Sequence, residues 1–162
     1  MLEKPYMRFG FSLALVLLTA ACCSWFNRVG MAWFYPHIER SALTPPDYVF
    51  PIVWLILYVL LVLSFDRILS LPPTENKPAV LNFIFNMFLQ VLWTYVFFYK
   101  GSFLLGFVVL VVLDFATAVL FEQFYKLQRA AGYLLVPYMM WLLFATYLNW
   151  MVVQLNGNVY GG

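Results

Sequence analysis

One stripe of residues in the segment 133–155 has the side chains that a ligand-binding wall needs. The segment is an uncharged run of 23 residues. At about 100° per residue, five side chains fall within an arc of about 100° on one face of a helix: Tyr138, Trp141, Ala145, Leu148 and Asn149. Aromatic rings, a small residue and an amide favour binding of a flat apolar molecule. The alternative is that the rings face lipid and that Ala145 only allows two helices to approach closely.

A second polar and aromatic face lies in the segment 80–99. Asn82, Asn86, Gln90, Trp93 and Phe97 fall within an arc of about 80° on a helix. Because amides are costly against lipid unless they are hydrogen-bonded, this face should point to the interior of a bundle. We expect Asn82 and Asn86 mainly to hydrogen-bond neighbouring helices.

Trp54 and Tyr58, in the segment 46–65, complete the aromatic set. Together these residues predict a cavity inside the membrane that is walled by aromatic rings. Gln90 and Asn149 would be its sparse polar groups. A cavity of this kind suits a large, flat, hydrophobic ligand.

Motifs for enzymatic or metal chemistry are absent from the sequence. There is no glycine-rich nucleotide loop, no plausible Ser/His/Asp set and no haem-attachment motif. The single histidine, His37, has no second ligand near it in sequence, and the adjacent Cys22 and Cys23 are interpreted as packing residues. Asp114 is the only ionisable residue expected inside a span. One such residue is not enough for a proton relay, and its carboxyl group should face protein. The sequence favours a binding protein over an enzyme.

The elements that must position these residues are membrane-spanning helices. Of the 162 residues, 65% are hydrophobic and 10% are charged, which is too few charges for a water-soluble surface. Apolar runs long enough to cross about 30 Å of hydrocarbon predict a single all-α domain, 1–162. It would be a bundle of five transmembrane helices at 9–26, 46–65, 80–99, 103–123 and 133–155. For 9–26 a cleaved signal peptide is the alternative, because a basic start precedes the apolar run.

The longest predicted connection, 27–44, separates the first two spans. A connection of 18 residues without an obvious element is typical of a functional lid. Its candidate lid residues are Arg28, Tyr35, His37 and Arg40. The alternative is a flexible loop whose aromatic residues lie at the membrane interface.

Basic residues are distributed unequally between the two predicted sides of the membrane. The side of the N-terminus and of the second and fourth connections has six, and the other side has three, namely Arg28, Arg40 and Lys100. The positive-inside rule then places the N-terminus in the cytoplasm. The net charge of +2 is too small, and the basic residues too scattered, to favour binding of nucleic acid.

Three motifs resemble those of the TspO/translocator protein family, which includes the tryptophan-rich sensory proteins and the peripheral benzodiazepine receptor. They are PYxxWxxFAxxLN at 137–149, a double proline followed by FPIVWLILY at 50–58, and Trp93 followed by Phe97 and Phe98. The resemblance covers nearly the whole chain. It implies a five-helix membrane bundle, usually a homodimer, here expected in a bacterial cytoplasmic membrane. It also implies a ligand site beneath the first loop that includes Trp54, Trp93, Trp141, Ala145 and Leu148.

The ligands implied by this resemblance are porphyrins and, in some members, sterols and synthetic benzodiazepine-site compounds. No Lys or Arg follows Tyr147, so the C-terminal sterol-type pattern is absent and a tetrapyrrole, protoporphyrin IX or haem, is preferred. No cofactor is required. Leu43, Gln90 and Tyr95 replace a tryptophan, an asparagine and a proline of the family pattern, which alters the lid and one wall. The implied roles are transport, sensing and light-dependent porphyrin degradation. The alternative is a small structural or assembly membrane protein without a dedicated ligand.

Overall fold

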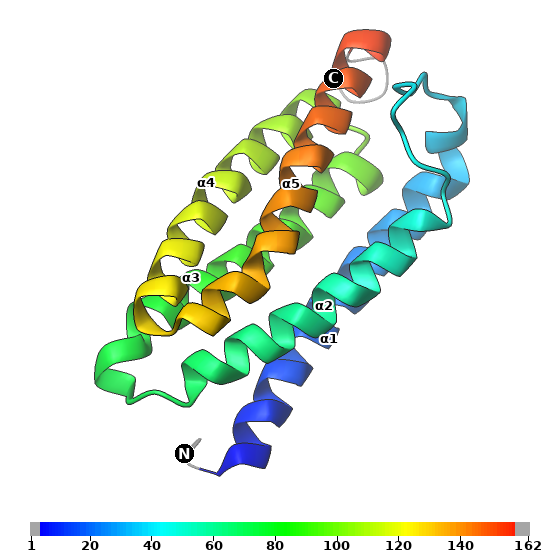
Figure 1. Cartoon of the computed structure of the whole chain (residues 1–162). Coiled ribbons are helices and arrows are strands. Elements are labelled where there is room, and N and C mark those ends of the chain that lie inside the picture. The colour runs from blue at the N-terminus through cyan, green and yellow to red at the C-terminus, as the bar shows by residue number, and fades with distance from the viewer. Residues whose placement is uncertain (1–3, 158–162) are drawn as a thin grey trace.

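Helices account for most of the chain in the computed structural model, which describes residues 4–157 (Figure 1). In this range five long helices are each long and apolar enough to cross a membrane, and no strand occurs. They are α1 Pro5–Trp33, α2 Val49–Leu69, α3 Pro73–Thr94, α4 Phe103–Leu127 and α5 Arg129–Asn156. A 3₁₀ turn, η1 Tyr35–His37, follows α1, and a π-helical turn, η2 Tyr95–Tyr99, continues α3. The predicted all-α bundle of five transmembrane helices is confirmed.

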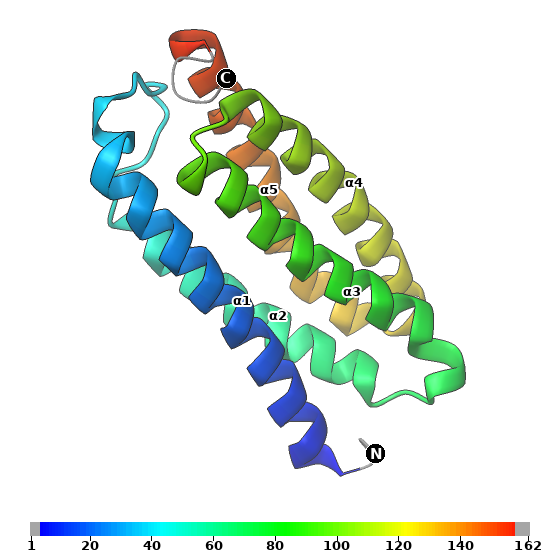
Figure 2. The same ribbon diagram turned by 180° about the vertical axis from the view of Figure 1, so that it is seen from behind.

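The helices pack in a ring whose order differs from their order in the chain. α1 packs against α2, α2 against α5, α5 against α4, α4 against α3, and α3 against α1. Figure 2 shows α3 and α4 side by side, with α1 crossing in front of α2. α1 begins at the end of the bundle where α2 joins α3, and α5 ends beside the connection between α1 and α2 (Figure 1).

A stack of phenylalanine rings fills the end of the bundle near the α2–α3 connection. The rings of Phe65 and Phe83 lie parallel with centroids 4.0 Å apart, and Phe124 stacks on Phe83 at 6.0 Å. All three side chains are completely buried. This end of the bundle is therefore closely packed, as protein interiors usually are. The cavity described below lies toward the other end.

Amide and hydroxyl groups link α3 to α4, as predicted for Asn82 and Asn86. Asn82 Nδ2 donates to the carbonyl oxygen of Ala116 at 3.3 Å and to Gln123 Oε1 at 3.1 Å. Thr117 Oγ1 donates to Asn86 Oδ1 at 2.6 Å. In lipid such bonds stabilise helix pairs by about 0.6–2 kcal/mol each, so these amides hold the bundle together and do not line a site.

The carboxyl of Asp114 is directed toward protein, as the cost of a carboxyl group against lipid requires. Thr146 Oγ1, on the neighbouring helix α5, donates to Asp114 Oδ2 at 2.7 Å. The side chain therefore joins α4 to α5.

The ends of several helices differ from the sequence prediction. α1 runs to Trp33 instead of residue 26, so Arg28 lies on a helix and the first connection is 34–48. α3 begins at Pro73 instead of residue 80: proline is well tolerated at the first helical position, and Asn76 Nδ2 donates to the carbonyls of Ile68 and Leu71. α2 runs over 49–69, α4 reaches residue 127 and α5 begins at 129, so the predicted fourth connection is reduced to Gln128.

The connection between η2 and α4 is the predicted tight turn. Gly101 has φ +67°, a conformation that glycine adopts without steric cost. α3 with η2 and α4 are consequently antiparallel neighbours.

Candidate ligand-binding site

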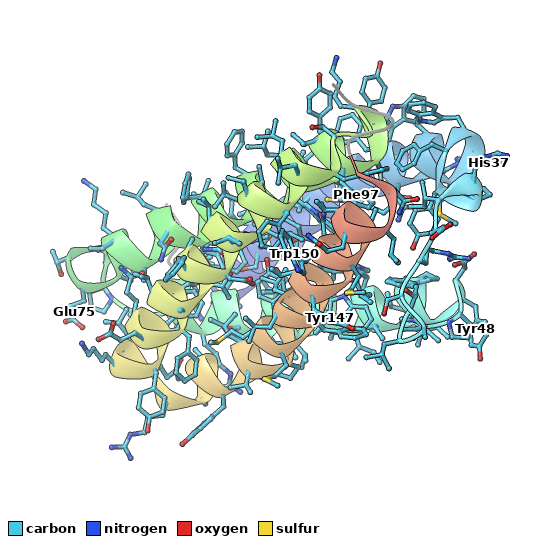
Figure 3. All side chains as sticks on the ribbon, turned by 90° about the horizontal axis from the view of Figure 1, so that it is seen from above. His37, Tyr48, Glu75, Phe97, Tyr147 and Trp150 are labelled. Atoms are coloured by element: carbon cyan, nitrogen blue, oxygen red, sulfur yellow. The ribbon has the colours of Figure 1, made fainter. Side chains whose placement is uncertain are left out.

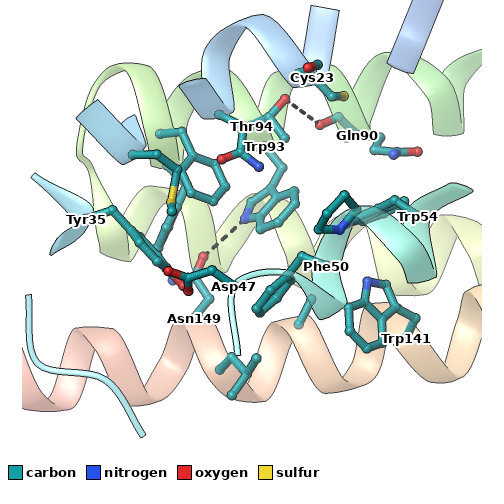
Figure 4. A pocket seen from close by; sticks show the side chains of 18 of the residues that line it. Cys23, Tyr35, Asp47, Phe50, Trp54, Gln90, Trp93, Thr94, Trp141 and Asn149 are labelled. Carbon is teal, nitrogen blue, oxygen red and sulfur yellow. Dashed lines mark hydrogen bonds between the residues drawn. The ribbon is translucent and has the colours of Figure 1, made fainter. Parts of the chain in front are cut away.

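A cavity of about 500 Å³ lies between α1, α2, α3 and α5, with residues of the first connection at its mouth. Figure 4 shows four aromatic side chains directed toward this space from three helices: Phe50 and Trp54 of α2, Trp93 of α3 and Trp141 of α5. Phe50 and Trp141 contact each other edge to face, with centroids 5.8 Å apart. The volume is within the range of about 300–1,000 Å³ found for small-molecule sites.

Most of the site residues predicted from the sequence line this cavity. They are Arg28, Tyr35, Arg40, Trp54, Tyr58, Gln90, Trp93, Phe97, Trp141, Ala145, Leu148 and Asn149. The residues that the sequence analysis selected on α2, on α3 with η2 and on α5 therefore form walls of one cavity.

Two predicted residues, Tyr138 and His37, do not line the cavity. Tyr138 is completely buried behind the wall, where its ring contacts Trp54 edge to face at 6.4 Å and its hydroxyl donates to Gln90 Oε1 at 3.4 Å. His37 is exposed at the outer end of the bundle, opposite to the end at which Glu75 lies (Figure 3). Tyr138 supports a wall residue, and His37 is part of the surface of the first connection.

The polar groups of the cavity are largely engaged with protein partners. Trp93 Nε1 donates to Asn149 Oδ1 at 3.2 Å (Figure 4), and Asn149 Nδ2 donates to the carbonyl oxygen of Phe103 at 2.9 Å. Gln90 Nε2 donates to the hydroxyl of Tyr58 at 2.9 Å. The two amides therefore fix the orientation of Trp93 and Tyr58, and leave a wall that is mainly apolar.

Helix α1 supplies one whole wall that the sequence analysis did not predict. Ala20, Cys23, Ser24, Asn27 and Met31 line the cavity together with Arg28. Their spacing of three or four residues was a readable signal, because it defines one face of a helix. The assumption that the helix ended at residue 26 concealed it.

The mouth of the cavity is held by an ion pair. Arg40 Nη1 donates to Asp47 Oδ1 at 2.7 Å, and the Arg40 guanidinium lies 5.1 Å from the ring centroid of Tyr35. The hydrogen bond to Asp47 raises the pKa of Arg40, and burial raises the pKa of the Tyr35 hydroxyl. Arg40 thus stays charged and Tyr35 neutral at neutral pH. Asp47 also lines the cavity and was not predicted.

The first connection is also tied to the end of α5. The backbone N–H of Glu39 donates to Asn156 Oδ1, and Asn156 Nδ2 donates to the carbonyl oxygen of Glu39, both at 2.8 Å. This reciprocal pair joins the first connection to the last turn of α5.

The fold and the cavity define an integral membrane protein with an aromatic cavity between its helices and residues of its first connection at the mouth of that cavity. The chain belongs to the TspO/MBR family, whose model matches residues 12–155. It is 29% identical over 157 residues to the tryptophan-rich protein TspO of Chlorobaculum tepidum, which covers 96% of this chain and 99% of that protein. It is 36% identical over 131 residues to protein CrtK of Rhodobacter capsulatus, covering 77% of this chain and 79% of that protein. The tryptophan-rich sensory protein of Cereibacter sphaeroides is 31% identical over 125 residues, with 77% and 78% covered.

Proposed function

We propose that the cavity binds porphyrins or closely related tetrapyrroles. The observation that carries the proposal is the set of three indole rings, Trp54, Trp93 and Trp141, which reach one cavity from three different helices. A porphyrin presents two broad apolar faces, and aromatic contacts each contribute about 0.5–1.5 kcal/mol beyond the area that they bury. Walls on several sides suit a flat molecule better than a single aromatic patch would.

The charge at the mouth supports the same class of ligand. Arg28, Arg40 and Asp47 line the cavity near the first connection and leave a net positive charge there, because Asp47 is paired with Arg40 only; the remaining walls are mainly apolar and aromatic. Porphyrin propionates are anionic, and a hydrogen bond between a guanidinium and a carboxylate is about twice as strong as a neutral one. A porphyrin would therefore enter with its ring inward and its propionates at the first connection.

The test is quenching of tryptophan fluorescence by protoporphyrin IX in detergent, compared between Trp141→Ala and Trp150→Ala. Both residues are on α5, but Trp150 is directed toward Phe107, at 4.9 Å between centroids, and does not line the cavity. We expect saturable quenching, with a Kd raised at least tenfold, about 1.4 kcal/mol, by Trp141→Ala only. Quenching that does not saturate, or equal effects of the two variants, would instead support a structural or assembly role without a dedicated ligand.

We also propose that the protein lies in a bacterial cytoplasmic membrane as a homodimer, with its N-terminus in the cytoplasm. The support for the orientation is the distribution of basic residues. The end of the bundle where α1 begins has Lys4, Arg8, Arg67, Lys77, Lys126 and Arg129, against Arg28, Arg40 and Lys100 at the other end.

A further inference from the structure

A groove outside the cavity brings two cations and several aromatic side chains together. It lies where the last turns of α1 meet the end of η2, and it is lined by Trp25, Arg28, Trp33, Tyr99 and Lys100, with two small apolar residues of α1. The α1 residues are spaced as one helical face. The groove is therefore a continuous strip along α1 with Lys100 beside it.

The length of α1 indicates that the groove lies at the depth of the lipid headgroups. Arg8 and Arg28 are 20 residues apart on α1, which corresponds to about 30 Å, the thickness of the hydrocarbon core. Lys100 lies in the connection between η2 and α4, beyond the ends of both. Trp25, with 64% of its surface exposed, and the exposed Tyr99 are residue types enriched at this depth.

The two cations of the groove are not neutralised by protein. Within residues 4–157 the ion pairs are Arg40 with Asp47 and Lys126 with Glu122, and neither Arg28 nor Lys100 takes part in one. Lys100 Nζ lies 5.7 Å and 6.0 Å from the ring centroids of Tyr95 and Tyr99. These contacts hold the ammonium over the rings without cancelling its charge.

The groove is held in shape by close packing of α1 on η2. Phe26 contacts Tyr95 at 5.3 Å and Tyr99 at 5.6 Å, in both cases edge to face. A Cβ atom added at Gly30 would lie 2.7 Å from the carbonyl oxygen of Phe98, so the two backbones are nearly in contact there. The shape of the groove is therefore set by contacts between α1 and η2.

We propose that this groove is a binding site for the headgroup of an anionic phospholipid. The phosphate would lie between Arg28 and Lys100, and an acyl chain would run from it along the apolar side of α1 past Trp25. A free phosphate ester would offer the same charge. On the core side of Arg28, Trp25 and, two turns further along the same face of α1, the exposed Leu18 form an apolar strip, which favours a ligand with an attached acyl chain. Juxtamembrane Lys and Arg residues attract anionic lipid by about 1 kcal/mol each.

The experiment uses the full chain in mixed micelles with phosphatidylglycerol or phosphatidylcholine whose acyl chains are brominated, so that a bound lipid quenches nearby tryptophan. We expect phosphatidylglycerol to quench saturably and phosphatidylcholine to quench weakly. Lys100→Gln and Arg28→Gln should each raise about fivefold the concentration of phosphatidylglycerol that gives half-maximal quenching. Lys100→Arg should retain it. The matched control is Lys126→Gln, at the opposite end of the bundle and already paired with Glu122 at 2.6 Å.

Three results would overturn the proposal. Equal quenching by the two lipids would show that the cations select no headgroup. An equal loss in Lys126→Gln would show a response to overall charge and not to the groove. Displacement of phosphatidylglycerol by an equal concentration of inorganic phosphate would show a phosphate site that does not use the acyl chain. Circular dichroism of each variant distinguishes loss of the site from loss of the fold.

Discussion

Ala145 offers the most direct test of whether the ligand occupies the cavity. It lies on α5 between Trp141 and Leu148 on the cavity wall. A phenyl ring at this position would occupy ligand space, so Ala145→Phe should weaken binding of protoporphyrin IX at least tenfold, about 1.4 kcal/mol. Equilibrium titration of tryptophan fluorescence measures the change.

Ala14→Phe is the matched control for this prediction. Ala14 is exposed on α1 and does not line the cavity, so the same added ring should leave the affinity unchanged. If Ala145→Phe folds and binds with unchanged affinity, the ligand does not occupy this cavity.

Individual residues show how far helical spacing alone can predict a site. Trp141, Ala145 and Leu148, which helical spacing placed on one face of α5, all line the cavity, because the face of a helix follows from the sequence. Tyr138 and Asn149 lie about 20° apart at one edge of the same arc, directed toward α3. There Tyr138 is bonded to Gln90 and Asn149 to Trp93. Asn149 still lines the cavity, whereas Tyr138 is buried behind its wall. This difference depends on the position of α3, which the spacing within α5 does not contain.

At the scale of whole elements, the approach of α1 to η2 depends on the absence of a side chain at Gly30. Ala at this position would place its Cβ 2.7 Å from a backbone oxygen of Phe98, so Gly30→Ala should destabilise the protein by about 1–3 kcal/mol, as overpacking does. A Cβ atom added at Gly10, on the same helix, would meet no atom within 4 Å. Gly10→Ala should therefore be neutral or stabilise by up to about 1 kcal/mol through helix propensity. Equilibrium unfolding in mixed micelles measures both, and equal effects would contradict the close approach.

The first connection should control release of the ligand. Asn156 makes both hydrogen bonds that join Glu39 to α5, and each such bond contributes about 0.5–1.5 kcal/mol. Because both bonds are exposed, we take the lower end of that range, about 1 kcal/mol for the two together. Asn156→Ala should thus raise the dissociation rate of protoporphyrin IX about fivefold and change association little. Gln154→Ala, exposed nearby on α5, should change neither rate. Stopped-flow fluorescence gives both, and a change confined to association would indicate electrostatic steering instead of a lid.

The ends of the elements were less predictable than their existence. The polar pair Asn27 and Arg28 suggested that the first span ends at residue 26, but α1 continues for two further turns because Gly30 packs against Phe98. The prolines and charges of 71–78 suggested a loop, but Asn76 bonds the carbonyls at the end of α2 and starts α3 early. In both cases a contact with a distant or preceding element decides the boundary, and composition does not report such contacts.

At the scale of the whole molecule, the two ends of the bundle differ in construction. The end where α2 joins α3 is filled by stacked phenylalanine rings. The other end has the cavity, the first connection of the chain and the groove between α1 and η2. Arg28 lines both the cavity and the groove. The orientation of the bundle therefore decides which compartment the mouth of the cavity faces, and the positive-inside rule predicts that it faces away from the cytoplasm.

Single cysteines at the two ends test this orientation. His37 and Glu75 are exposed at opposite ends of the bundle (Figure 3), so His37→Cys and Glu75→Cys can be compared in a background in which Cys22 and Cys23 are replaced by alanine. In spheroplasts of a bacterial host, a membrane-impermeant maleimide should label the cysteine at position 37 at once. The cysteine at position 75 should react only after the membrane is permeabilised, because the six basic residues of that end retain it in the cytoplasm. The opposite pattern would show an inverted protein with its cavity open to the cytoplasm, and labelling of both in intact spheroplasts would show that six against three basic residues does not select one orientation.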